Sequence, residues 1–147
     1  VFINGSNNLK DKEDLFFKLN NYKEKIIIYD HLRTSDFYEL IKKSDVILDS
    51  YPHGGCNTSL EGFYFNKIII TKPSQFLRGR FTYGFYKKMD ILEFICNTDY
   101  EIILKMKQIK NNENYKNKFE NLIIKSKNLL FNDNESINEW NKTLLTI

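Results

Sequence analysis

Four short apolar runs, separated from one another by helical patterns, constrain the fold of this 147-residue chain more than any other feature. They lie at about residues 1–4, 25–29, 46–48 and 68–71. Short continuous apolar runs rich in β-branched side chains are typical of strands that are buried on both faces. The order β-α-β-α-β-α-β predicts an α/β fold, in which a parallel, Rossmann-like sheet is flanked by helices.

Three helices are predicted between these strands. The first covers residues 11–22, where Leu15, Phe16 and Leu19 recur at helical spacing. Ser35 is a good N-cap for the second helix, and the third covers residues 58–65. The apolar side chains of the second and third helices that we expect to face inward are Phe37, Leu40, Ile41, Leu60, Phe63 and Tyr64.

After Pro73 the pattern becomes mainly helical. We expect a helix over residues 77–89, a short apolar stretch at 91–95, and a helix that is capped by Asn97 or Thr98 and runs to about Ile109. Two further helices are indicated by a stripe over residues 115–123 and by the pattern at 135–145. The chain is therefore predicted to be one partial domain, residues 1–147, with a sheet region over about 1–72 and a mainly helical extension over about 73–147.

Composition limits the partners and the compartment. The chain is 41% hydrophobic and 28% charged, with a net charge of +3 and no arginine-rich block, so we expect no nucleic acid partner. No apolar run approaches the length of a membrane span, and we expect no membrane partner. Cys56 and Cys96 form no metal-like cluster and no disulfide framework, which favours a reducing, cytoplasmic location.

The segment between the third and fourth strands carries the chemistry. A strand ends near Asp49, a loop follows in which Gly54 and Gly55 let the backbone approach and bind a ligand closely, and a helix begins near Asn57. Ligands of parallel sheets bind outside the carboxyl ends of the strands. A helix N-terminus offers unpaired N–H groups and the positive end of the helix dipole. Together these features predict an anion site that suits a phosphate or a diphosphate.

Polar side chains at the start of this helix extend the prediction. Asn57, Thr58 and Ser59 add donors, whereas Glu61 would repel phosphate and suits the hydroxyls of a ribose. Phosphate donors beside a hydroxyl acceptor indicate a nucleotide. In the alternative interpretation, Asn57 or Thr58 is only an N-cap and Glu61 only a partner of the helix dipole. The two interpretations have about equal support from these residues.

No other motif in the sequence gives strong evidence for a second kind of site. Neither a P-loop nor a G-x-G-x-x-G fingerprint is present, and His31 and His53 are too isolated to indicate a metal site. Cys56 has no adjacent histidine and is not expected to be a nucleophile. Arg80, which follows the fourth strand, is a candidate contact for phosphate, while Arg78 fits a solvated helix start.

Several blocks, in this order and spacing, resemble the C-terminal catalytic region of O-linked N-acetylglucosamine transferases (glycosyltransferase family 41). The blocks are residues 44–49, 55–61 and 67–71, with plausible counterparts at Leu77 and Arg80, 92–95 and 130–132. The resemblance extends along most of the chain. It implies a GT-B fold whose C-terminal, Rossmann-like half binds the nucleotide.

The resemblance also implies roles for single residues. Asn57 and Thr58 match the family's two phosphate-binding threonines, and Glu61 matches the aspartate that holds the ribose hydroxyls. Cys56 stands where the family has a histidine at the diphosphate. The remaining matches lie in the loop and helix start around the base and ribose, where Leu32 would offer backbone groups to uracil, Thr34 replaces a lysine and Phe37 replaces a histidine. These departures leave the identity of the donor open.

By this resemblance the protein would transfer a sugar such as N-acetylglucosamine, with inversion, from a UDP-sugar to a protein side chain, with no metal. The chain would supply the donor-nucleotide half, and the N-terminal half of the same polypeptide is expected upstream of Val1 together with a lysine that contacts the departing diphosphate. We therefore assign no catalytic residue here and expect the chain to be inactive alone. The alternatives are a catalytically inactive nucleotide-binding domain and a Rossmann-like interaction domain.

Overall fold

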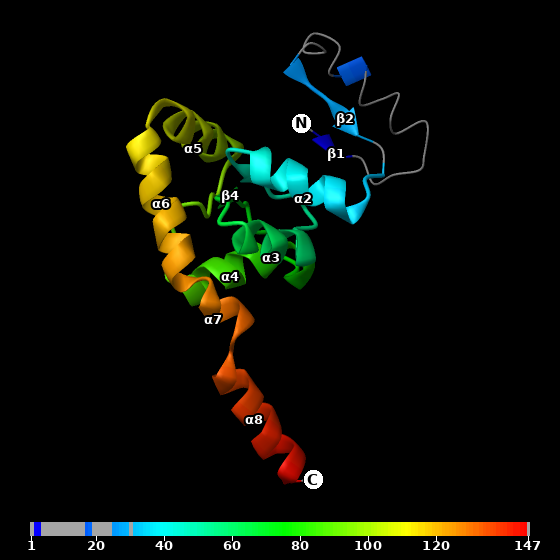
Figure 1. The fold of residues 1–147 in the computed structure, drawn as a ribbon, viewed down its shortest axis with the longest axis vertical. Coiled ribbons are helices and arrows are strands. Elements are labelled where there is room, and N and C mark those ends of the chain that lie inside the picture. Colours follow the sequence, from blue (N-terminus) through cyan, green and yellow to red (C-terminus); the bar gives the residue numbers. More distant parts are fainter. Residues whose placement is uncertain (1, 4–16, 19–24, 30, 147) are drawn as a thin grey trace. The chain divides into compact units, whose positions relative to one another are not determined.

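The computed structural model describes residues 2–3, 17–18, 25–29 and 31–146. These residues form a mixed α/β fold that is mostly helical, with two parallel pairs of short strands (Figure 1). The chain divides into two compact units, residues 1–40 and 41–147, which are treated separately below. The markers of the helix predicted over residues 11–22, namely Leu15, Phe16 and Leu19, lie outside the described residues.

In the first unit, strand β1 (Phe2–Ile3) pairs in parallel with β2 (Ile28–Tyr29). Helix α2 (Thr34–Lys43) begins in this unit and ends in the next. The prediction that Ser35 is the N-cap of this helix is wrong, because the helix already includes Thr34. The first turn is instead spanned by an ion pair of 3.1 Å between Arg33 Nε and Asp36 Oδ2.

In the second unit, β3 (Ile47–Leu48) pairs in parallel with β4 (Ile69–Ile70). A parallel bridge between Thr71 and Ile95 adds the short apolar stretch 91–95 at the other side of β4. Every pairing among the described residues is parallel, as predicted. A single sheet of four strands stays a prediction, because the two pairs belong to different units.

Seven helical segments follow β3 in the described part of the chain (Figure 1). They are α3 (Asn57–Tyr64), η2 (Leu77–Gly79), α4 (Phe81–Met89), α5 (Asp99–Asn111), α6 (Glu113–Ser126), α7 (Asn128–Phe131) and α8 (Asn134–Leu145). Helix α5 packs along α6, and α4 packs against α7. Of the two predicted caps of α5, Thr98 is the one that accepts a hydrogen bond, from the N–H of Glu101.

The helix predicted over residues 77–89 is interrupted. Arg80 has φ −127° and ψ 6°, so the short turn η2 ends before α4 begins. Just before it, the backbone of Gly79 lies so close to Pro52 that a Cβ there would stand 2.3 Å from the Pro52 oxygen. The break follows from this tertiary contact, which a helical pattern cannot reveal.

The core of the second unit surrounds β4. Its fully buried members are Phe63, Ile68, Ile69, Ile70, Tyr86, Phe94, Cys96 and Ile123. The Tyr86 hydroxyl accepts the N–H of Ile69 at 2.9 Å, and complete burial raises the pKa of the Tyr86 phenol far above its ordinary value. The polar end of this side chain is therefore satisfied inside an apolar cluster.

One inward-facing residue was predicted wrongly. Phe63 is fully buried, but Tyr64 is 60% exposed. Successive helical residues are separated by about 100°, and the buried face of α3 is formed by Ser59, Gly62 and Phe63, which leaves Tyr64 beyond its edge. Tyr64 instead meets the ring of Phe131 edge-on, with 6.1 Å between the ring centroids.

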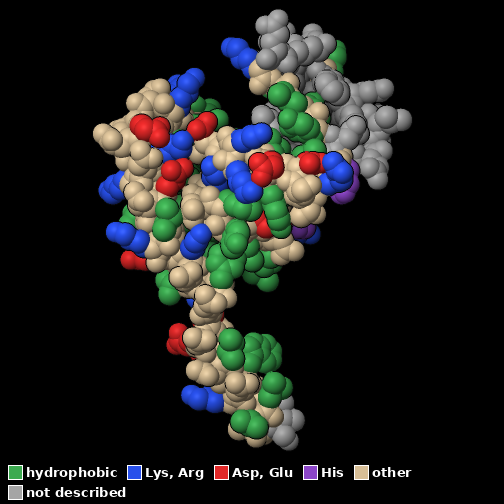
Figure 2. All heavy atoms as spheres, viewed as in Figure 1, with side chains coloured by type: hydrophobic (Ala, Val, Ile, Leu, Met, Phe, Trp, Pro, Cys, Tyr) green, Lys and Arg blue, Asp and Glu red, His purple; other side chains and the backbone are tan. Residues whose placement is uncertain are grey.

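Charges are mixed on the surface. On the face drawn in Figure 2, basic and acidic side chains are interspersed over the second unit. Among the described residues, no helix has both the length and the apolar character needed to cross a membrane.

Candidate functional site at the carboxyl end of β3

The predicted order of strand, loop and helix is present. Strand β3 ends at Leu48, residues 49–56 form the loop, and α3 begins at Asn57. The Asp49 N–H donates to the Ile70 carbonyl at 2.9 Å, so the strand pairing continues to the first residue of the loop. The loop therefore starts at the carboxyl ends of two neighbouring parallel strands, where ligands of such sheets bind.

Asp49 joins the loop to the adjacent strand. Its Oδ1 accepts the Gly55 N–H at 2.6 Å, and its Oδ2 accepts the Thr71 hydroxyl at 2.7 Å. Thr71 is buried at the end of β4. Both carboxylate oxygens are thus committed within the protein. The sequence indicated Asp49 only as the end of a strand, because nothing local identifies its partner on β4.

The carbonyl of Gly55 is held from the other side. It accepts the Ser59 hydroxyl at 3.1 Å and the Thr82 hydroxyl at 3.3 Å, and these two hydroxyl oxygens lie 2.7 Å apart. Ser59 and Thr82 are almost completely buried. A Cβ at Gly55 would stand 2.7 Å from Ser59 Oγ, so this close arrangement requires glycine.

A second loop, residues 72–80, packs beside the first. The Gly54 N–H donates to the Arg78 carbonyl at 3.0 Å. Arg80, the candidate phosphate contact, donates from Nη1 to the Ser74 carbonyl at 3.1 Å and lies over the Tyr83 ring at 4.7 Å. Its guanidinium therefore supports the second loop, and its contact with phosphate stays a prediction.

The donors left for an anion lie at the start of α3, because the N–H groups of Gly54 and Gly55 are used within the protein. Cys56 occupies the N-cap position and makes no capping hydrogen bond through its side chain. Asn57 and Thr58 are exposed and lie inside the first turn. The alternative in which either residue is simply the N-cap is therefore wrong.

Glu61 lies in the second turn of α3 and is half-buried. It is four residues beyond Asn57, so the two side chains share one face of the helix. Its contact with a ribose stays a prediction.

The three residues predicted around the base and ribose belong to the first unit. Leu32 precedes α2 and is half-buried, Thr34 is the exposed first residue of α2, and Phe37 is half-buried in its first turn. Their contacts with a nucleotide stay predictions.

One basic residue near this edge was not identified from the sequence. Lys72 follows Thr71, and its ammonium lies 4.2 Å from the centroid of the Tyr51 ring in the first loop. Its hydrogen bond to Asp99 raises the pKa of Lys72 above the ordinary value. Within the described parts of the chain, no group of three or more His, Cys, Asp or Glu side chains could hold a metal ion.

The fold of this chain was compared with solved protein structures. Among them, 29 chains match, including a mutant of the O-GlcNAc transferase from Thermobaculum terrenum. The match has a TM-score of 0.70 and 19% sequence identity over 80% of this chain. The chain shares its fold with part of a glycosyltransferase. It covers 23% of the length of that transferase chain. No family model and no curated protein sequence matches it.

Proposed function

We propose that the protein is a nucleotide-sugar-dependent glycosyltransferase of GT-B architecture, and that this chain supplies the half that binds the donor nucleotide. The observation that carries the proposal is the likeness of the fold to an O-GlcNAc transferase. The uncapped start of α3 at the carboxyl end of β3 supports it, because that position suits a diphosphate.

In this proposal UDP is the nucleotide. Its diphosphate accepts hydrogen bonds from the N–H groups and side chains of residues 56–58, since the N–H of Gly55 already donates to Asp49. The ribose hydroxyls donate to Glu61. Residues around the start of α2, namely Leu32, Thr34 and Phe37, contact the uracil and ribose.

The proposed reaction is an inverting transfer of a sugar such as N-acetylglucosamine to a protein side chain. The acceptor oxygen forms a bond to the anomeric carbon, the bond from that carbon to UDP breaks, and the acceptor proton passes to a base. Negative charge develops on the departing diphosphate, and preset donors at a helix N-terminus stabilise it. We assign the base to no residue of this chain and require no metal.

Calorimetric titration with UDP and with uridine tests the binding half of the proposal. Glu61→Ala should weaken both ligands by about 1–3 kcal/mol, the usual loss for a hydrogen bond to a charged group. Asn57→Ala and Thr58→Ala should weaken UDP more than uridine. Unchanged affinity of the folded Glu61→Ala protein excludes the ribose contact, and no UDP binding to the unmodified chain excludes the nucleotide site.

A transfer assay with UDP-sugars and a peptide pool tests the enzymatic half. We expect no turnover by residues 1–147 alone, because catalysis requires donor and acceptor to be held together by both halves of the enzyme. A longer polypeptide that adds the N-terminal half should transfer sugar. Turnover by the short chain contradicts this division of roles, whereas UDP binding without turnover by the longer chain favours an inactive nucleotide-binding domain.

We further propose a cytoplasmic location. Cys56 and Cys96 are both free thiols, which suits a reducing compartment. Fractionation of cells that express the protein tests this, and recovery in a secreted fraction contradicts it.

A further inference from the structure

We propose that Asp49 is a positioning residue for the nucleoside diphosphate: its two hydrogen bonds fix Gly55 and thereby preset the donors at the start of α3. The inference rests on the proposed donor site and adds a residue to it. Asp49 does not touch the ligand in this proposal. It acts through Gly55, which is the last residue before the N-cap of α3.

Asp49 is well suited to fix a peptide group. One carboxylate oxygen accepts the Gly55 N–H at 2.6 Å, while the other accepts the hydroxyl of the buried Thr71 at 2.7 Å. Because both oxygens are committed, the carboxylate is held against rotation. Thr71 is in turn fixed by its own backbone, which bonds to the carbonyl of Phe94 and to the N–H of Cys96.

The opposite side of Gly55 is fixed as well. The hydroxyls of Ser59 on α3 and Thr82 on α4 both bond to its carbonyl. Three side chains therefore bond to one glycine, and Thr71 holds one of them, Asp49, in place. The next residues along the chain are Cys56, Asn57 and Thr58, whose positions follow from that of Gly55. A loop that must become ordered when a ligand binds loses conformational entropy, which weakens binding. A loop that is already ordered in the free protein avoids this loss.

The negative charge of Asp49 makes it possible to distinguish a positioning role from direct contact with the ligand. A carboxylate next to a proposed diphosphate site repels the ligand, so its benefit must come from its hydrogen bonds. In Asp49→Asn the amide oxygen can accept from Gly55 and the amide nitrogen can donate to the Thr71 hydroxyl. That variant keeps both hydrogen bonds without the charge, whereas Asp49→Ala removes both.

The experiment is calorimetric titration of the full chain and its variants with UDP and with uridine. Asp49→Ala should bind UDP about tenfold more weakly, which is the size of effect expected when roughly one hydrogen bond is lost. Its affinity for uridine should be unchanged. Asp49→Asn should bind UDP at least as tightly as the unmodified chain. The control is Asp45→Ala, which lies before the same strand, pairs with Lys116 and should alter neither affinity.

Hydrogen exchange at the Gly55 amide gives a readout without ligand. Exchange should be slow in the unmodified chain and in Asp49→Asn, and fast in Asp49→Ala. If Asp49→Ala does not fold, Thr71→Val replaces it, since valine keeps the volume and removes only the hydroxyl. Thr71→Val should weaken UDP about threefold and leave uridine unchanged.

Three results overturn the inference: an unchanged affinity of Asp49→Ala for UDP, an equal loss for UDP and uridine, or a loss in Asp49→Asn as large as in Asp49→Ala. Failure of the unmodified chain to bind UDP overturns the proposed function as well. The two failures are therefore distinguishable in one set of titrations.

Discussion

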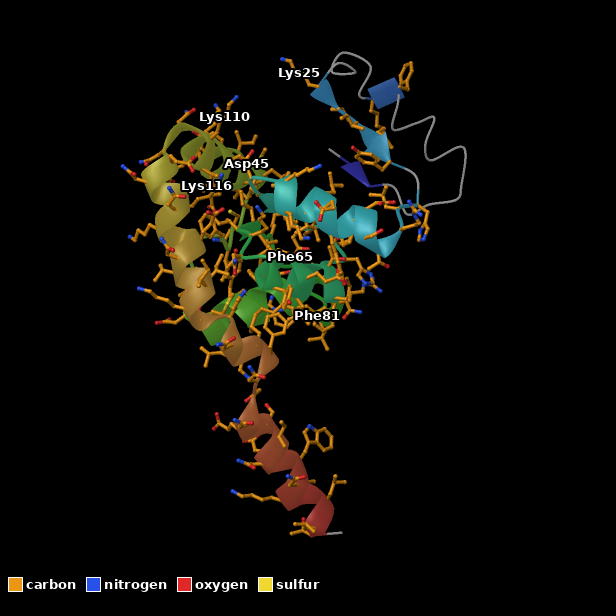
Figure 3. All side chains as sticks on the ribbon, in the orientation of Figure 1. Lys25, Asp45, Phe65, Phe81, Lys110 and Lys116 are labelled. Atoms are coloured by element: carbon orange, nitrogen blue, oxygen red, sulfur yellow. The ribbon has the colours of Figure 1, made fainter. Side chains whose placement is uncertain are left out.

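The two ends of the β3–β4 pair are held in different ways. At the amino end, lysines from α6 and its C-cap secure the strands and α3. Lys116 forms an ion pair with Asp45 at 2.9 Å, and the two side chains lie next to one another in Figure 3. Lys127 donates to the Tyr64 carbonyl at 2.8 Å and to Asn66 Oδ1 at 2.7 Å.

At the carboxyl end the contacts are made by short side chains that are buried or half-buried. Asp49 and two hydroxyl side chains bond to Gly55, Thr71 bonds to Asp49, and the buried Gly79 packs on the same loop. Long lysine side chains tolerate displacement, and exposed ion pairs contribute little. Short buried side chains tolerate almost none, because a shift of less than an ångström breaks their hydrogen bonds. The rigid end is the one that carries the candidate site, as preset binding geometry requires.

The largest effect is expected for Gly79→Ala at the carboxyl end. The new Cβ would stand 2.3 Å from the Pro52 oxygen and 2.1 Å from Ser74 Oγ. The loops must then separate, and the free energy of unfolding should fall by about 3 kcal/mol in chemical denaturation. Gly84→Ala is the control, since nothing lies within 4 Å of its Cβ, and it should stabilise α4 by about 0.5–1 kcal/mol. Equal effects of the two variants would contradict the close packing.

Thr82→Val should have the next largest effect. It removes the hydroxyl that contacts Ser59 and the Gly55 carbonyl inside a buried site. We expect a loss of about 1–2 kcal/mol, measured by urea denaturation, because buried polar groups lose a partner. Thr143→Val on the exposed face of α8 should change stability by less than about 0.5 kcal/mol. A loss no larger than that of the control would show that the hydroxyl pair contributes little.

At the amino end, Lys127→Met should cost about 1 kcal/mol, since it removes two hydrogen bonds that are partly open to water while keeping most of the side chain's length. Thermal unfolding measures the change. A loss greater than that of Thr82→Val would reverse the comparison between the two ends.

The smallest effect is expected for Asp45→Ala, at about 0.5 kcal/mol, because the carboxylate is 79% exposed and its ion pair is screened. The hydrogen bond and charge of Lys116 lower the pKa of Asp45 below its ordinary value of 3.8. A carboxyl group whose pKa is lowered in the folded state stabilises the fold at pH values above its ordinary pKa. This contribution is lost as the pH falls through the folded pKa. The difference between Asp45→Ala and the unmodified chain should therefore be constant from neutral pH to about pH 5 and vanish in stronger acid. A difference that grows on acidification has the wrong sign for this pair.

Local patterns accounted for the parts of the molecule that depend on neighbours in sequence. The loop with its glycines and the helix after β3 were predicted at nearly their observed bounds, because glycine and helical periodicity are local signals. The Thr98 cap of α5 is local in the same way. The parallel direction of the strands followed from the helices between them, since a crossover connection brings the next strand back in the same direction.

The contacts that shape the candidate site could not be predicted. Asp49 meets Thr71, which is 22 residues away in sequence, and Ser59 meets Thr82, which is 23 residues away. Neither pair has a spacing that distinguishes it from any other polar pair. The break before α4 likewise depends on the approach of Gly79 to Pro52.

The sequence by itself determined the order of the elements from β2 to β4, the parallel direction of the described strands and the segment in which a phosphate site is expected. Only the tertiary structure decided that Cys56, rather than Asn57 or Thr58, is the N-cap of α3 and that the N–H of Gly55 is bonded to Asp49. The physical reason is that periodicity and turn residues act over a few residues. The orientation of a peptide group in a loop depends instead on which distant side chains reach it, and that is settled when strands and helices pack together.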